Sequence, residues 1–362
     1  MTVEQCWHRV PGGTATSMIG TLGALRHHAD LDLVGVAARH AEPPPDPFVP
    51  PIPVVHLPLG RLALYESWHA LRWPSIERAT GPVDVVHATA IAVPPTKAPL
   101  VMTIHDLAFL ADPTQPTRHG LRFFTRGTEL AKRHARLILV PSEATASECR
   151  HAGFDPDRIR LVPWGVDRSE VDSDEIESAR RRHGLERPFV LFVGTIEPRK
   201  NLTALLSAMV ELAGLGVDLV LVGPEGWNED LGPKVAAAEA VGVNVHRLGF
   251  LPPADLPALY GGCAAFCFPS LREGFGMPVL DAMACGAPVV TSLGTATEEV
   301  AGDAALLVDP RDHQALAKAL ARIIGHPGLA DELRGRGQDR AATYTWERTA
   351  DLTAAAYAEV IR

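Results

Sequence analysis

Long hydrophobic runs and paired cysteines are both missing from this sequence. No apolar run reaches the 18 residues that a membrane-spanning helix needs, and the start shows no signal-peptide pattern. The five cysteines are scattered, Cys263 and Cys267 have no second pair of ligands nearby, and no HExxH motif occurs. We therefore expect a cytoplasmic protein with buried thiols, no bound metal and no cofactor.

Positive charge is also in deficit. There are 34 Lys and Arg residues against 43 Asp and Glu residues, which gives a formal net charge of −9. Because binding to nucleic acid usually needs a basic face, this balance argues against nucleic acid as the main partner. The 362 residues, of which 46% are hydrophobic and 21% charged, suit an ordinary globular protein long enough for two domains.

Short apolar segments alternate with helix-like segments twice along the chain. This pattern predicts an α/β fold made of two doubly wound units with parallel strands. A weak strand candidate at 3–7 opens the first unit, and a charged connector is expected at 168–187. We expect domains at 1–167 and 168–345, and a closing helix at 346–362.

The stretch 273–281, with the sequence EGFGMPVLD, organises the second half. Gly274 and Gly276 permit a tight turn with exposed amides, because glycine adopts positive φ without strain. Glu273 would lie on this loop and Asp281 on the helix that follows, with free amides and a helix dipole between them. Such a place suits a diphosphate, and the acids beside it could accept hydrogen bonds from sugar hydroxyls. On these residues alone, a strand–loop–helix unit with solvated acids is the alternative.

Two adjacent cations, Arg199 and Lys200, follow the apolar strand candidate at 189–194. An arginine fork and a mobile lysine together suit a diphosphate, and open parallel sheets bind ligands beyond the carboxyl ends of their strands. An ordinary solvated surface pair is the alternative.

The first half carries two further candidates at strand or turn ends. His105 directly follows the strand candidate at 100–104, where it could donate to a sugar oxygen or orient a reacting hydroxyl. A structural histidine capped by Asp106 is the alternative. Gly12 and Gly13 lead into a helix, a geometry that can bind an anion but more often is a plain turn.

Residues 118–136 predict a helix with a strongly basic side. Such a helix could dock on an anionic bilayer as a peripheral membrane contact. An ordinary domain helix with a solvated basic side is the alternative.

Four motifs occur in an order that makes the whole chain resemble a known family. Each is weak alone and together they are specific: Pro11-Gly12-Gly13, Thr103-Ile104-His105-Asp106, Gly194-Thr195-Ile196-Glu197-Pro198-Arg199-Lys200-Asn201, and Glu273-Gly274-Phe275-Gly276 with Asp281. The chain resembles the retaining family 4 glycosyltransferases of the GT-B fold over essentially its whole length. The resemblance implies two facing Rossmann-like domains, an acceptor on the first and a nucleotide-sugar donor bound chiefly by the second.

The resemblance also implies roles for individual residues. Arg199 and Lys200 would hold the donor diphosphate, and the Gly12-Gly13 loop would close over it. Glu273 would contact hydroxyls of the donor sugar. The second acid of the family motif, normally a glutamate, would contact the ribose, and here that acid is Asp281. The other donor-binding residues that the motifs imply are Gly194, Gly274, Phe275 and Gly276.

The expected chemistry agrees with this resemblance. Breaking a sugar–phosphate bond places negative charge on the diphosphate, which Arg199, Lys200 and nearby amides would stabilise without a dedicated nucleophile. In similar enzymes the acceptor attacks on the face that the leaving group vacates, which retains configuration, and the departing phosphate takes the proton. His105 would position or polarise. The motif wording resembles mannosyl- and rhamnosyltransferases of polysaccharide pathways, so we favour transfer of mannose from GDP-mannose to a hydroxyl of a glycan or lipid-linked acceptor.

Two other functions fit the same two-domain plan. One is a nucleotide-sugar epimerase or a phosphorylase. A phosphorylase would need a lysine that anchors pyridoxal phosphate and a longer chain, and an epimerase would need a further carboxylate. The other is an inactive nucleotide-sugar-binding protein, for which the shorter acid Asp281 would be the only hint.

Overall fold

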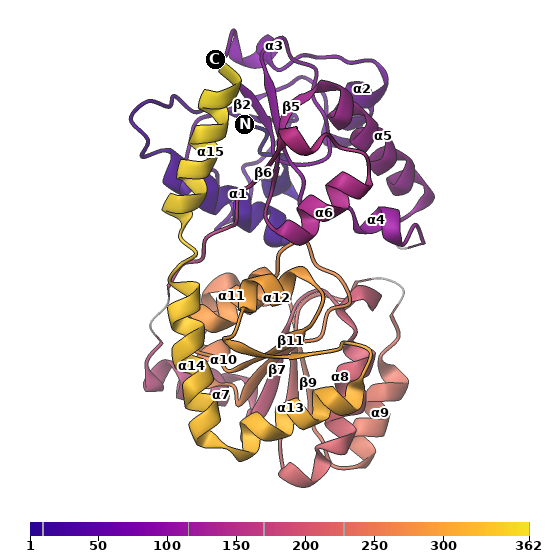
Figure 1. The fold of residues 1–362 in the computed structure, drawn as a ribbon, viewed down its shortest axis with the longest axis vertical. Helices are drawn as coiled ribbons and strands as arrows, with labels where there is room; N and C mark the ends of the chain where they lie inside the picture. Colours follow the sequence, from indigo (N-terminus) through magenta and orange to yellow (C-terminus); the bar gives the residue numbers. More distant parts are fainter. Residues whose placement is uncertain (9–10, 115, 169–170, 227–228, 362) are drawn as a thin grey trace. The chain divides into compact units, whose positions relative to one another are not determined.

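The computed structural model describes all residues except 9–10, 115, 169–170, 227–228 and 362 (Figure 1). The chain divides into two compact units, Met1–Gly165 with Thr345–Arg362, and Val166–Tyr344. The division after Gly165 lies two residues before the expected domain boundary, and the closing helix α15 (Trp346–Ile361) belongs to the first unit.

The first unit is built on short parallel strands. They are β1 (Gly35–Ala37), β2 (Val54–His56), β3 (Val86–Ala88), β4 (Leu100–Thr103), β5 (Ala135–Val140) and β6 (Ile159–Leu161). Thr2 forms a parallel bridge with Val36, and its N–H donates to the carbonyl of His87 (2.9 Å). The start of the chain therefore lies between β1 and β3, which gives the order β2, β1, Thr2, β3, β4, β5, β6.

The prediction of a strand at 3–7 is wrong. Residues Glu4–Trp7 form the 3-10 helix η1 instead. Glu4 is 2% exposed, and its Oε2 accepts a hydrogen bond from the N–H of Ala38 at 2.8 Å. A buried carboxylate needs such partners, so this contact takes the place of strand pairing after Val3.

Helices cover both faces of this sheet. They are α1 (Gly12–Leu25), α2 (Arg61–Ala70), α3 (Glu77–Thr80), α4 (Ala108–Ala111), α5 (Arg118–His134) and α6 (Glu143–His151), with the short η2 (Pro156–Arg158). Figure 1 shows α2, α5 and α6 on one side of the sheet and α1 with α15 on the other. The alternation along β4 explains the two cores, because Met102 packs with the first set and Val101 with the second.

The second unit holds a single parallel sheet. Its strands are β7 (Phe189–Val193), β8 (Asp218–Val222), β9 (Val245–Gly249), β10 (Ala265–Phe268), β11 (Val289–Ser292) and β12 (Ala305–Val308). Their order is β12, β11, β10, β7, β8, β9, so β7 and β10 are central neighbours and the chain reverses direction across the sheet between them. This is a doubly wound arrangement, whose ligand crevice lies beyond the carboxyl ends of the central strands.

Eight α-helices and three 3-10 helices are described in the second unit. They are α7 (Ser173–His183), α8 (Leu202–Glu211), α9 (Gly232–Ala240), α10 (Leu256–Gly262), α11 (Met277–Ala284), α12 (Ala296–Ala301), α13 (His313–Gly325) and α14 (Pro327–Ala341), with η3 (Pro198–Lys200), η4 (Ala213–Leu215) and η5 (Pro253–Asp255). A charged connector is expected across 168–187, but residues Ser173–His183 of this range form the helix α7. Asp172 and Glu175 form a reciprocal capping box and Gly184 ends the helix in the left-handed region, so local caps stabilise a helix with little apolar surface.

None of the helices that the structure describes is long and apolar enough to cross a membrane.

Candidate active site

The site of the second unit forms where two neighbouring strands end. β7 leads through Gly194 to η3, and β10 leads through Pro269 to the loop that carries Glu273. Since β7 and β10 pair in parallel, both connections leave the same edge of the sheet. The N–H of Leu271 donates to the carbonyl of Arg199 (2.8 Å), which fixes one connection against the other.

This arrangement brings Glu273, Arg199 and Lys200 into direct contact. Glu273 Oε2 lies 2.8 Å from Arg199 Nη1, and Glu273 Oε1 lies 2.7 Å from Lys200 Nζ. The Ser270 hydroxyl donates to Glu273 Oε1 (2.5 Å). Only 9% of the Glu273 side chain and 8% of the Lys200 side chain are exposed, so two of the three charges are largely removed from water.

Sequence reasoning did not select Glu197, Ser270 or Asn201 as site residues. The Glu197 side chain is 4% exposed, and its Oε1 lies 2.7 Å from Arg199 Nε, so Arg199 contacts two carboxylates. Asn201 has a φ of 58° and its Nδ2 donates to the carbonyls of Pro269 (3.1 Å) and Pro310 (2.6 Å). Its left-handed backbone turns the chain from η3 into α8 directly after the two cations. Glu197 and Asn201 do lie inside the Glu-Pro-Arg-Lys-Asn run, which is the one signal that could have indicated them.

The charges set the protonation states of the cluster. Burial raises the pKa of Glu273, but the charges of Arg199 and then Lys200 outweigh burial and lower that pKa to about 2. Burial lowers the pKa of Lys200, and Glu273 opposes that shift. The cluster therefore holds an ionised carboxylate against two cations, an arrangement that a dianionic ligand group can enter by taking over those cations.

The glycine-rich loop before α11 contains one residue with a special backbone conformation, Gly276, and one buried aromatic residue, Phe275. Gly276 has a φ of 113° and precedes α11, and a Cβ there would lie 2.9 Å from Thr297 Cγ2. Glycine is therefore required by both backbone conformation and space. Phe275 is 3% exposed and its ring packs edge-on against Tyr344 with centroids 5.9 Å apart.

Asp281 lies on α11, and its side chain forms no hydrogen bond or ion pair with any residue that the structure describes. Burial, and then the charge of Asp167, raise the pKa of Asp281 to about 7. A carboxyl group of this kind is partly protonated near neutral pH. It differs in this respect from Glu273, which stays ionised.

His105 and the Gly12-Gly13 turn belong to the first unit. His105 follows β4, and its Nε2 lies 2.8 Å from the carbonyl of Thr89, so Nε2 carries the proton. Its Nδ1 is buried without a hydrogen-bond partner among the described residues, which leaves an acceptor lone pair. Burial lowers the pKa of His105, although the Thr89 carbonyl and Asp106 oppose the shift, so the ring is neutral.

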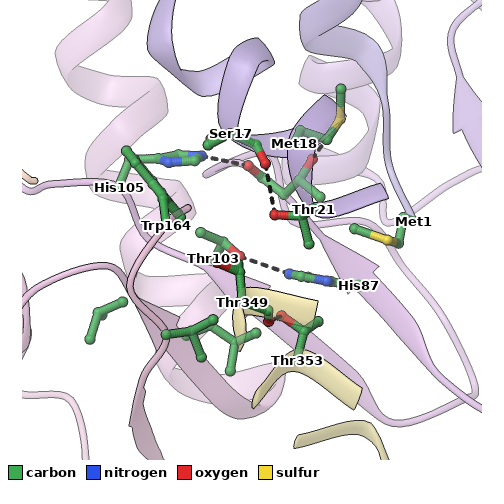
Figure 2. Close-up of a pocket in the computed structure, with 14 residues that line it drawn as sticks. Met1, Ser17, Met18, Thr21, His87, Thr103, His105, Trp164, Thr349 and Thr353 are labelled. Atoms are coloured by element: carbon green, nitrogen blue, oxygen red, sulfur yellow. Dashed lines mark hydrogen bonds between the residues drawn. The ribbon is translucent and has the colours of Figure 1, made fainter. Parts of the chain in front are cut away.

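A small cavity adjoins His105, and its volume of about 30 Å³ has room for roughly two water molecules. Figure 2 shows His105 and Trp164 close together, with the hydroxyls of Ser17 and Thr21 across the cavity. The rings of His105 and Trp164 are 5.2 Å apart. Hydroxyls and imidazoles share the lining with apolar side chains, and the polar groups give water in this cavity hydrogen-bond partners.

The Gly12-Gly13 turn opens α1. Gly12 has a φ of 62°, and neither glycine has an atom within 4 Å of where a Cβ would stand. Backbone conformation rather than space requires glycine at position 12.

Among the side chains that the structure describes, no three His, Cys, Asp or Glu residues cluster in a way that could hold a metal ion.

Comparison with known sequences finds a glycosyltransferase family model for each half of the chain. The family described as "Glycosyltransferase Family 4" matches residues 11–170, and "Glycosyl transferases group 1" matches residues 173–340. O-antigen chain mannosyltransferase B of Escherichia coli is 30% identical over 280 residues, which cover 75% of this chain and 74% of that protein. D-inositol 3-phosphate glycosyltransferase of Rhodococcus jostii is 31% identical over 273 residues, covering 70% of this chain and 59% of that protein. The chain matches only 35% of the length of the Escherichia coli mannosyltransferase WbdA, at 28% identity.

Solved structures share the fold at low sequence identity. Anabaena HepE in complex with UDP-glucose has a TM-score of 0.75 and 21% identity, with 96% of each chain covered. WaaG, a glycosyltransferase involved in lipopolysaccharide biosynthesis, has a TM-score of 0.71 and 18% identity, again with 96% of each chain covered. This chain therefore belongs to the group 1, family 4 glycosyltransferases and is an enzyme of that class with the GT-B fold.

Proposed function

We propose that this enzyme transfers a mannosyl residue from GDP-mannose to a hydroxyl of a glycan or lipid-linked acceptor, with retention of configuration and without a cofactor. The observation that carries the proposal is the contact of Glu273 with Arg199 and Lys200 at the carboxyl edge of the second sheet. The choice of mannose rests on the mannosyltransferases among the relatives.

The cluster suits departure of a nucleoside diphosphate. In the transfer, the bond from the anomeric carbon to the phosphate oxygen breaks and its electron pair stays on the diphosphate. Arg199 and Lys200 stabilise that growing negative charge, since donors fixed in a site of low water content need little reorganisation. The acceptor oxygen bonds to the anomeric carbon, and its proton passes to the departing phosphate.

Glu273 has two tasks in this proposal. Without ligand it balances the cations, and with the donor it accepts hydrogen bonds from sugar hydroxyls as the diphosphate takes over Arg199 and Lys200. Asp281 serves the ribose as a carboxyl that can donate as well as accept near neutral pH. The neutral His105 offers Nδ1 as an acceptor to a hydroxyl of donor or acceptor.

Thermal-shift measurements with GDP, UDP, ADP and dTDP test the nucleotide, because a ligand that binds only the folded state raises its melting temperature. GDP should give the largest shift. Incubation with labelled nucleotide sugars then separates the outcomes: product on an acceptor supports transfer, an epimer or a sugar phosphate supports the other enzyme classes, and binding without turnover supports an inactive protein. The anomeric coupling in the product's NMR spectrum distinguishes retention from inversion.

We also propose that α5 makes a peripheral contact with an anionic membrane. Arg118, Arg122, Arg126 and Arg133 are exposed at helical spacing along one side of the helix, beside a groove of about 490 Å³. Basic residues near an anionic bilayer each contribute roughly 1 kcal/mol, so four of them support reversible binding.

Co-sedimentation with phosphatidylglycerol vesicles tests the contact. The wild type should bind these vesicles and not phosphatidylcholine vesicles, and Arg122→Glu combined with Arg133→Glu should abolish binding. The matched control is Arg26→Glu combined with Arg311→Glu, which removes the same charge from exposed positions elsewhere. Equal loss in both double variants would show a general charge effect and contradict the assignment to α5.

A further inference from the structure

A shallow hollow at the carboxyl edge of the first sheet is not among the sites described above. Among the residues that line it are Trp7, Arg39, His40, Gly60, Arg61 and Leu62, and its volume is about 590 Å³. These residues follow the Thr2 bridge, β1 and β2, which all run in parallel, so three chain segments end at one edge. The position and volume are those of a small-molecule site in an open α/β sheet.

One wall of the hollow is a fixed aromatic stack. The rings of Trp7 and His40 are 4.6 Å apart and inclined by only 8°. The Trp7 indole N–H donates to the carbonyl of Glu42 (2.8 Å), and His40 Nε2 lies 3.0 Å from Glu4 Oε1. Glu4 is itself buried and held by the N–H of Ala38. The stack is thus ordered before any ligand arrives, which lowers the entropy lost on binding.

Two arginines give the hollow its charge. Arg39 is exposed and Arg61 is half-buried, and neither guanidinium group forms an ion pair or a hydrogen bond with another residue in the described part of the chain. The positive charge of Arg61 also affects a neighbouring histidine. Burial, and then the charges of Arg61 and His40, lower the pKa of His8 to about 4. Glu4 is the nearby carboxylate, and it is held behind the stack by His40 and Ala38, so the two guanidinium groups are left for an anion to bind.

We propose that this hollow binds the acceptor, and that the acceptor is a sugar bearing a phosphate or carboxylate group. The sugar ring lies against the Trp7–His40 stack, and the anionic group is recognised by Arg39 and Arg61. Arginine forks match the two oxygens of a phosphate or carboxylate, and a flat apolar wall suits the C–H face of a sugar ring.

The placement favours acceptor over donor. The cations assigned to the donor diphosphate, Arg199 and Lys200, belong to the second unit, whereas the hollow belongs to the first. His105 follows β4 and so lies at the same edge of the same sheet as the hollow. Identifying the bound sugar as the acceptor rests on the proposed function. The binding of a charged sugar to the hollow can be measured independently of that function.

Calorimetric titration of the 362-residue chain tests the inference with mannose 6-phosphate against mannose, and with glucuronate against glucose. The charged sugar of each pair should bind at least about tenfold more tightly in 50 mM salt, and the difference should shrink in 500 mM salt, as for any exposed charge–charge contact. A phosphate preference alone or a carboxylate preference alone identifies which anion the acceptor carries.

Three variants assign the binding to the hollow. Arg39→Ala and Arg61→Ala should each weaken binding of the charged sugar roughly threefold to tenfold and leave the neutral sugar unchanged, as expected for one lost charge-assisted contact. The exposed Arg26→Ala is the matched control and should change nothing. Equal affinity for charged and neutral sugars, or unchanged affinity in the combined Arg39→Ala and Arg61→Ala variant, would overturn the inference.

A further variant separates this inference from the proposed function. Lys200→Ala weakens the donor cations, and binding of mannose 6-phosphate should survive it. If it does not, the sugar phosphate occupies the donor site and the inference fails. If the nucleotides give no thermal shift while charged sugars still depend on Arg39 and Arg61, the proposed function fails and the hollow remains an anionic-sugar site.

Discussion

Replacing Glu273 by glutamine separates the structural task of this residue from its catalytic one. The change removes one negative charge from a contact in which Lys200 Nζ and Arg199 Nη1 each lie within 2.8 Å of a carboxylate oxygen. The amide oxygen of glutamine can still accept from Ser270 or Lys200. Arg199 also keeps Glu197, so Lys200 is the cation that loses its counter-charge.

The expected loss of stability follows from burial. Removing one partner of a buried ion pair typically destabilises a protein by about 3–5 kcal/mol, because the other charge is left uncompensated. Since glutamine keeps one acceptor, we expect a smaller loss of about 2–3 kcal/mol, in the range of hydrogen bonds to charged groups. For a unit of roughly 150–250 residues this lowers the melting temperature by about 4–12 °C.

The assay compares stability, nucleotide binding and turnover in the same variant. Turnover should fall at least about tenfold, because contacts with the donor sugar are lost in the transition state. The affinity for GDP should stay the same or rise, since a diphosphate then supplies the charge that Lys200 lacks. Saturating GDP should therefore raise the melting temperature at least as much in the variant as in the wild type.

The control is Glu225→Gln, which breaks the exposed pair with Arg247 and should shift the melting temperature very little. If the affinity of Glu273→Gln for GDP falls in proportion to its turnover, Glu273 acts by ordering the cations and not by contacting the sugar. That result would refute the reasoning.

Three further predictions concern neighbouring residues. Lys200→Ala should lower turnover at least about tenfold while circular dichroism shows an intact fold, because Glu273 keeps Arg199 and Ser270 as partners; a rate near that of the wild type would contradict its role. The raised pKa of Asp281 means that the folded state binds more protons than the unfolded state between about pH 4 and pH 7, so stability should fall as pH rises through that window. Asp281→Asn should remove this component in urea unfolding at pH 5 and pH 8, and an identical pH slope in both proteins would disprove it. Asn201→Ala should lower the free energy of unfolding by about 1–3 kcal/mol, because two hydrogen bonds are lost and alanine is unfavourable at a positive φ. Asn201→Gly loses the same hydrogen bonds but tolerates the positive φ, so its loss should be smaller. Equal losses in both variants would rule out a backbone contribution.

Local sequence was sufficient for the elements around the site. A short apolar strand followed by polar residues marks a buried parallel strand and its carboxyl end, and both β7 and β10 obey this rule. The prediction from local sequence failed at Glu4. Its buried carboxylate accepts a hydrogen bond from the N–H of Ala38, a residue 34 positions away. The prediction also failed at α7, where caps rather than apolar periodicity stabilise the helix.

The sequence by itself determined the two α/β units, the family and the residue types that a diphosphate needs. These follow from short apolar segments that alternate with helix-like segments and from the order of the four motifs. Only the tertiary structure decided that Lys200 and Glu273, 73 positions apart, contact each other, since that contact depends on β7 and β10 being neighbours in the sheet. The same holds for the Trp7–His40 stack and the hollow that it lines together with Arg39 and Arg61. Strand order is fixed by packing over the whole unit, and no periodicity along one segment encodes it.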